Sequence, residues 1–225
     1  MKKIISAFII SALVLSCNSV DKNDKSNTET VVIGSASSDS VKEKTSAQLK
    51  EINTNEALIA TALMAAPEES RSGCTVIGYN MAGEFVTLKE GDNEFICLAD
   101  DPNKEGFSAA CYHKSLEPFM ARGRELKSQG KSRQEIFDIR EEEAKSGKLT
   151  MGKAGSTLHI YFGEKSQYDP ETAEVVGAKY RYVVYLPWAT PESTGLPTQP
   201  YASNHPWIMD AGTHKAHIMI SPKVK

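Results

Sequence analysis

Residues 157–162 alternate between two kinds of side chain, with His159 and Tyr161 on one side of an extended chain and apolar groups on the other. This period of two residues is typical of a β-strand whose faces meet different surroundings. Similar short runs, bounded by turn residues, predict six further strands, over residues 75–80, 84–89, 94–99, 107–112, 180–186 and 216–220.

A different period, close to 3.6 residues, predicts a helix over residues 53–66. Its Leu, Ile and Ala side chains recur on one face, as in a helix that packs on a sheet. Asn53 stands where an N-terminal cap is expected, with Glu56 three residues later, and Pro67 ends the pattern.

A second helical pattern is a pair, over residues 115–130 and 132–147. Ser132 and Glu135 form a capping box at the start of the second helix. The first helix is basic on its outer side and the second is acidic, so an antiparallel pair places opposite charges near each other. The sequence therefore predicts a helical hairpin inserted between two groups of strands.

Together these elements predict an α+β fold: one domain over residues 51–225, with an antiparallel or mixed sheet, an N-terminal helix and the inserted hairpin. An antiparallel meander is the simplest order for the first four strands. The composition, with 40% hydrophobic and 24% charged residues, is that of an ordinary globular protein.

The first seventeen residues have the organisation of an export signal. Two lysines precede an apolar stretch at residues 4–15, which is too short to span a bilayer as a helix. The run Leu13-Val14-Leu15-Ser16-Cys17 resembles the lipobox of bacterial lipoprotein precursors. This resemblance implies that residues 1–16 are a cleaved signal peptide and that acyl chains on Cys17 attach the protein to a membrane.

The same resemblance implies a place in the cell envelope. Asn18 follows the cysteine, where an aspartate often marks inner-membrane retention in that family, so the outer membrane is expected rather than the inner one. The polar composition of residues 17–50 predicts a flexible tether between the lipid and the domain. Removing residues 1–16 deletes two lysines and no acid, so the net charge moves from −3 to −5, which predicts no binding to nucleic acid.

Three cysteines remain after Cys17, in a compartment that favours disulfides. If residues 94–99 and 107–112 pair around a turn centred on Lys104, Cys97 and Cys111 lie opposite each other. We therefore predict a cross-strand disulfide between them, with Cys74 as a free thiol. A cysteine nucleophile, Cys111 with His113 beside it on one face of the strand, is an alternative.

The unusual chemistry is concentrated near the C-terminus, between the last two predicted strands. This proline-rich stretch carries flat aromatic groups and imidazoles, which line ligand clefts when a sheet holds them. The leading hypothesis is a non-enzymatic, lipid-anchored envelope protein that binds a small ligand or a partner protein. The residues predicted to form the binding cavity are His159, Tyr161, Trp188, Trp207 and His217.

Two alternatives remain from the sequence. The first is a metal-dependent hydrolase in which His205, Asp210, His214 and His217 hold an ion such as zinc and activate a bound water. No ligand spacing characteristic of a zinc enzyme is present, so no cofactor is the primary prediction. The second alternative is a structural lipoprotein without a pocket.

Overall fold

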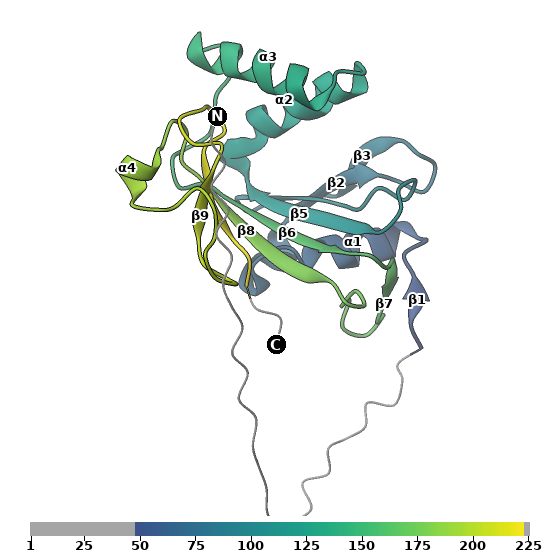
Figure 1. The fold of residues 1–225 in the computed structure, drawn as a ribbon. Coiled ribbons are helices and arrows are strands. Elements are labelled where there is room, and N and C mark those ends of the chain that lie inside the picture. Colours follow the sequence, from purple (N-terminus) through teal and green to yellow (C-terminus); the bar gives the residue numbers. More distant parts are fainter. Residues whose placement is uncertain (1–47, 223–225) are drawn as a thin grey trace, which may run out of the picture. The chain divides into compact units, whose positions relative to one another are not determined.

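The computed structural model describes residues 48–222, which form the predicted α+β fold (Figure 1). One large mixed sheet carries helices on both faces. The predicted signal peptide (1–16), Cys17 and most of the predicted tether lie outside the described residues. Within residues 48–222, no helix has the length and apolar character needed to cross a membrane.

Among the described residues, all seven predicted strands form, each within one residue of its expected ends. The strands are β1 (Lys50–Glu51), β2 (Thr75–Tyr79), β3 (Phe85–Lys89), β4 (Phe95–Leu98), β5 (Phe107–His113), β6 (Thr157–Gly163), β7 (Gln167–Tyr168), β8 (Lys179–Tyr185), β9 (Trp207–Met209) and β10 (His217–Ile220). The α-helices are α1 (Asn55–Leu63), α2 (Glu117–Ser128), α3 (Arg133–Lys145) and α4 (Pro191–Thr194), and short 3-10 helices cover Glu68–Gly73 and Lys114–Leu116.

The strand order in the large sheet is β3-β2-β4-β5-β6-β8-β10-β9. Neighbours are antiparallel except β2 and β4, which are parallel. The expected antiparallel meander is therefore wrong. After the β2–β3 hairpin the chain crosses the start of β2, and β4 then pairs with β2 on the edge opposite β3. Gly91 lies in this crossing, where an added Cβ atom would be only 2.3 Å from the main-chain carbon of Cys74, so the crossing depends on a residue without a side chain.

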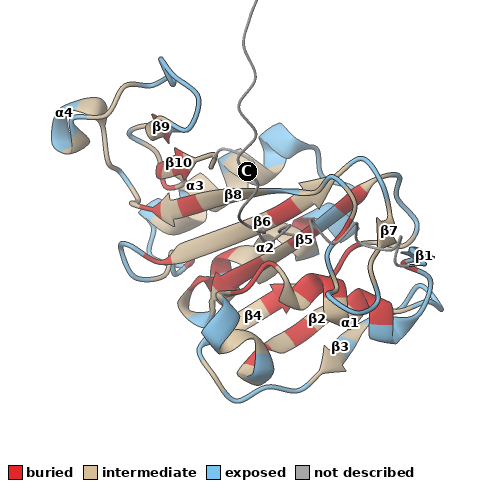
Figure 2. Ribbon diagram, turned by 90° about the horizontal axis from the view of Figure 1, so that it is seen from below, coloured by how far each residue is buried: buried red, intermediate tan, exposed pale blue. Residues whose placement is uncertain are grey.

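One face of the sheet packs against α1, and Figure 2 shows buried residues along this helix and the strands beside it. Leu58 and Ala62 of α1 are fully buried in a core that includes residues of β2, β4 and β5. Thr54, and not Asn53, caps the helix, because its hydroxyl oxygen accepts a hydrogen bond from the N–H of Ala57 (3.1 Å). We call this side of the sheet the α1 face.

The opposite side, here the hairpin face, packs against α2. Phe119 and Leu126 of α2 are buried, whereas α3 has no buried residue. The predicted capping box at the start of α3 is confirmed. The expected meeting of opposite charges is also confirmed, because Arg122 Nη2 of α2 lies 2.6 Å from Glu143 Oε1 of α3. Polar contacts therefore contribute to holding α3 on the domain.

Among the strands and α-helices of residues 48–222, four short ones were not predicted: β1, β7, β9 and α4. Strands β1 and β7 pair with Lys50 opposite Tyr168, so the ordered domain includes Lys50, which the sequence assigns to the tether. Strand β9 lies within the proline-rich stretch and pairs with β10. Elements of two to four residues are too short to display a hydrophobic period, so pairing partners alone determine them.

Candidate functional site

The strand register separates the residues predicted to line one ligand cavity. His159 and Tyr161 project from the α1 face, where Tyr161 belongs to the buried core. Trp207 and His217 project from the hairpin face, and Tyr185, the register partner of His217, belongs to the core beneath α2. Because side chains alternate across a sheet, the two pairs point in opposite directions. The expectation of a single cavity is therefore wrong.

Trp188 lies apart from both pairs, in the turn that follows β8. It is 42% exposed, and its backbone has a φ of 69°, which is uncommon for a residue with a side chain. The following loop does form a surface hollow, of about 550 Å³. The residues that line it are Pro191, Glu192, Gly195, Leu196, Pro197, Tyr201 and His205. Ligand binding by this loop stays a prediction. The residues that line the hollow do not include Trp188, Trp207 or His217, which the sequence predicts to bind the ligand.

The four residues expected to hold a metal ion are also dispersed. The ring of His205 lies tilted against the ring of Tyr201, with 3.7 Å between ring centroids. His217 Nδ1 donates to the carbonyl oxygen of Lys215 (2.8 Å), and Asp210 Oδ2 pairs with the ammonium of the same lysine (3.0 Å). Within residues 48–222, no three of the expected ligands meet closely enough to share an ion. The predicted histidine metal centre is therefore wrong, and the hydrolase alternative has no assembled ligand set.

His214, the remaining member of that set, ties the C-terminal strands to the helical hairpin. Its ring is fully buried between Phe119 and Phe137, with Nδ1 2.6 Å from Glu141 Oε2 of α3. Glu141 also accepts a hydrogen bond from the N–H of His214 (3.2 Å). This role could not be found from the sequence, because the two partners are far apart in the chain and neither belongs to a recognisable motif.

Burial of His214 and His217 predicts that the domain loses stability in mild acid. Burial lowers the pKa of both imidazoles, although Glu141 opposes this effect at His214. The unfolded chain, with a histidine pKa of about 6.5, therefore takes up protons first. The free energy of unfolding is expected to fall as the pH drops below about 6.5, since protonation then favours the unfolded state.

Urea unfolding at several pH values between 5 and 8 measures this effect. His214→Gln is expected to show a shallower fall than the unmodified chain, and His205→Gln, in the loop, serves as the control. The comparison between variants also removes the contribution of Asp100, a carboxyl whose pKa burial raises to about 6 and which acts in the opposite sense. Equal slopes for His214→Gln and the unmodified chain would show that this imidazole is not responsible.

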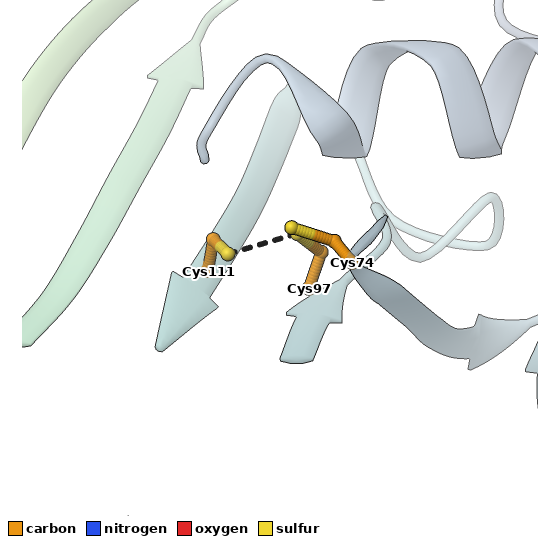
Figure 3. Close-up of side chains that lie close together, drawn as sticks. All are labelled: Cys74, Cys97 and Cys111. Atoms are coloured by element: carbon orange, nitrogen blue, oxygen red, sulfur yellow. Dashed lines mark hydrogen bonds between the residues drawn. The ribbon is translucent and has the colours of Figure 1, made fainter. Parts of the chain in front are cut away.

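Three cysteines meet beneath α1. Cys97 of β4 and Cys111 of β5 are register partners, and Cys74 immediately precedes β2 (Figure 3). All three side chains are fully buried, and every pair of sulfurs lies within 4.8 Å. Cys74 joins the other two because β2 runs parallel to β4. In the expected meander β3 would have separated Cys74 from the other two cysteines.

The surroundings of this thiol trio (Cys74, Cys97 and Cys111) are mostly apolar, with two polar partners at Cys74: its Sγ donates to the carbonyl oxygen of Ser70 (3.1 Å) and accepts from Asn93 Nδ2 (3.8 Å). The sulfurs belong to the same buried core as Leu58 and Val76, and Figure 3 shows a helix in the colour of α1 passing over them. Burial raises the pKa of Cys74 to about 11. The neighbouring thiol of Cys111, together with burial, also raises the pKa of Cys97. The thiols of Cys74 and Cys97 are therefore poor nucleophiles as they stand.

The structure confirms that Cys97 and Cys111 lie opposite each other on the paired strands β4 and β5. Their sulfurs lie 2.9 Å apart, whereas a disulfide bond is about 2.05 Å long. All three described cysteines are free thiols in this structure. The disulfide itself stays a prediction. Among the described residues, no hydrogen bond joins His113 to Cys111. The Nδ1 atom of His113 lies 2.8 Å from the hydroxyl oxygen of Ser115 instead.

Comparison with protein-family models, with curated proteins and with solved structures finds no match to this chain. The function is therefore argued from the geometry of the domain. Among the described residues, the thiol trio is the one group of cysteine, histidine or acidic side chains that is close enough to hold a metal ion.

Proposed function

We propose that this domain binds a thiophilic ion between Cys74, Cys97 and Cys111. The observation that carries the proposal is the convergence of three sulfurs from three separate chain segments, all within 4.8 Å of one another. Sulfur ligands select soft ions over hard ions such as magnesium or calcium, which prefer oxygen. Two of the sulfurs are carried by strands of the central sheet and the third immediately precedes a strand, which makes the ligand set rigid.

Burial of the trio implies that ion binding is coupled to local opening of the domain. The sulfurs are fully covered, and Leu58 and Ala62 of α1 belong to the same core. An ion therefore enters when α1 lifts or before the domain has folded. Because the ion binds only the folded arrangement of ligands, it adds to the stability of the fold.

A disulfide between Cys97 and Cys111 competes with the ion for the same sulfurs. The two outcomes exclude each other, since a disulfide leaves Cys74 as the only thiolate donor of the trio. Under the proposed function, ion binding belongs to the reduced protein and oxidation releases the ion.

The context of the domain is a further part of the proposal. The lipobox resemblance supports export, acylation of Cys17 and attachment to the outer membrane of the cell envelope. In that position the domain meets ions from outside the cytoplasm, and it holds them at the membrane surface only while its three thiols stay reduced.

Cadmium is a suitable probe, because cadmium thiolates absorb in the near ultraviolet. The full chain with Cys17→Ser, reduced before use, is expected to retain one cadmium ion per chain after gel filtration. Single replacements of Cys74, Cys97 or Cys111 by serine are expected to remove most of this binding, and treatment with an oxidant should do the same. Retention of cadmium, and of every other thiophilic probe tried, below roughly a tenth of an ion per chain in protein that is shown to be folded and reduced would refute the proposal.

A further inference from the structure

The thiol trio offers three ligands and no fourth. His159, the register partner of Cys111, has its ring against Tyr182 and Phe95 instead, with centroids 5.2 and 6.5 Å away. No histidine or carboxylate of the described residues joins the three sulfurs. Structural zinc sites are almost always four-coordinate. The geometry therefore favours an ion whose coordination shell is filled by three sulfur ligands.

The net charge of the bound complex also restricts the choice of ion. The residues of α1 in the adjoining core are Ala57, Leu58, Thr61 and Ala62, none of them charged. Three thiolates leave one negative charge around a divalent ion and two around copper(I), but none around a trivalent ion. An uncompensated charge in a dry core is strongly disfavoured. A trivalent occupant leaves a neutral complex.

One cation, Lys89, lies near the trio and is already engaged. Its ammonium donates to the carbonyl oxygens of Ser72 (2.8 Å), Cys74 (2.9 Å) and Glu90 (3.3 Å). An ammonium has three N–H donors, so these three main-chain oxygens use all of them. Lys89 therefore has no donor left for a thiolate sulfur, and its positive charge acts on Cys97 only through space.

We propose that the occupant is a trivalent thiophilic metalloid of the arsenic(III) class, held as a three-coordinate pyramid by Cys74, Cys97 and Cys111. This inference rests on the proposed function and names its ligand. In binding arsenous acid, each of three arsenic–oxygen bonds is replaced by an arsenic–sulfur bond. Each departing hydroxide takes the proton of one thiol, so three waters form and no oxidation state changes.

The route into the site also suits this ligand. Arsenous acid is uncharged in neutral water, whereas zinc and cadmium are hydrated dications. Because apolar side chains of α1 belong to the same buried core as the sulfurs, an uncharged molecule pays a smaller desolvation penalty on the way in.

Native mass spectrometry distinguishes this inference from the proposed function. The full chain with Cys17→Ser, reduced with a phosphine so that no added thiol competes, is incubated separately with arsenite, cadmium and zinc. With arsenite, the chain is expected to gain the mass of one arsenic atom less three hydrogens. In equimolar competition, arsenic should occupy at least about tenfold more chains than zinc.

Single serine variants test the ligand set. Cys74→Ser, Cys97→Ser and Cys111→Ser are each expected to lower arsenic retention at least about tenfold, because only two sulfurs remain. Thr61→Val, a change of similar volume in the buried face of α1, is expected to retain arsenic and serves as the control. Circular dichroism of each variant establishes that it is folded.

The outcomes separate the two proposals. Arsenic bound through three sulfurs supports both. Cadmium or zinc bound without arsenic overturns the inference and leaves the proposed function standing. If no probe binds to the folded, reduced chain, both are refuted. Arsenic that binds equally well after loss of Cys74 would also overturn the inference, because two sulfurs would then suffice.

Discussion

Gly91→Ala is expected to lower the free energy of unfolding by more than about 3 kcal/mol. Gly91 lies where the chain crosses the start of β2, and an added Cβ atom would be 2.3 Å from the main-chain carbon of Cys74 and the nitrogen of Thr75. Neither backbone atom can move without disturbing the β2 pairing. Asp92 and Asn93 also donate main-chain hydrogen bonds to Gly73 at this crossing. Urea unfolding followed by circular dichroism measures the loss.

Gly155→Ala is the matched control for this variant. A Cβ atom at Gly155 meets nothing within 4 Å, but its φ of 88° is unfavourable for alanine, so only conformational strain of about 1 kcal/mol is expected. The difference between the two variants isolates the steric cost at the crossing. If Gly91→Ala is no less stable than Gly155→Ala, the crossing does not require a glycine. Because Cys74 adjoins the crossing, any Gly91→Ala protein that folds should also lose cadmium.

Phe119→Ala is expected to destabilise the domain by about 3–5 kcal/mol, the range for removal of a buried phenyl ring. Phe119 is nearly fully buried and lies edge-to-face with Tyr185, with 5.6 Å between centroids. On its other side the guanidinium of Arg140 lies 3.9 Å from the ring centroid. Since α3 has no buried residue of its own, loss of this ring removes much of its attachment.

Hydrogen exchange measures the second expected effect of Phe119→Ala, the weaker attachment of α3. Amides of α3 are expected to lose protection in Phe119→Ala more than amides of β5 and β6. Phe119→Leu, which keeps most of the apolar volume, is expected to cost no more than about 1.5 kcal/mol and to retain α3 protection. Uniform loss of protection across the sheet and α3 would show that Phe119 supports the whole domain and not the hairpin in particular.

The chain's local patterns determined its elements. The period of two residues located seven strands within one residue of their ends, and the box of Ser132 and Glu135 located the start of α3. The symmetry of the hairpin around Lys104 was enough to place Cys97 opposite Cys111. These features depend on neighbours in the sequence or on a single turn, so the residues involved contain all the information needed.

Tertiary structure alone decided which elements became neighbours. Nothing in the alternation of β2 indicates that it pairs with β4, and this parallel pairing is what brings Cys74 to the other two sulfurs. In the C-terminal part, tertiary structure instead separates residues that the sequence predicts to share one cavity. They are close in sequence, yet the register of β8, β9 and β10 turns Trp207 and His217 away from His159. A strand pattern specifies two faces but not which partner lies beside them, and a site built from several strands depends on that choice.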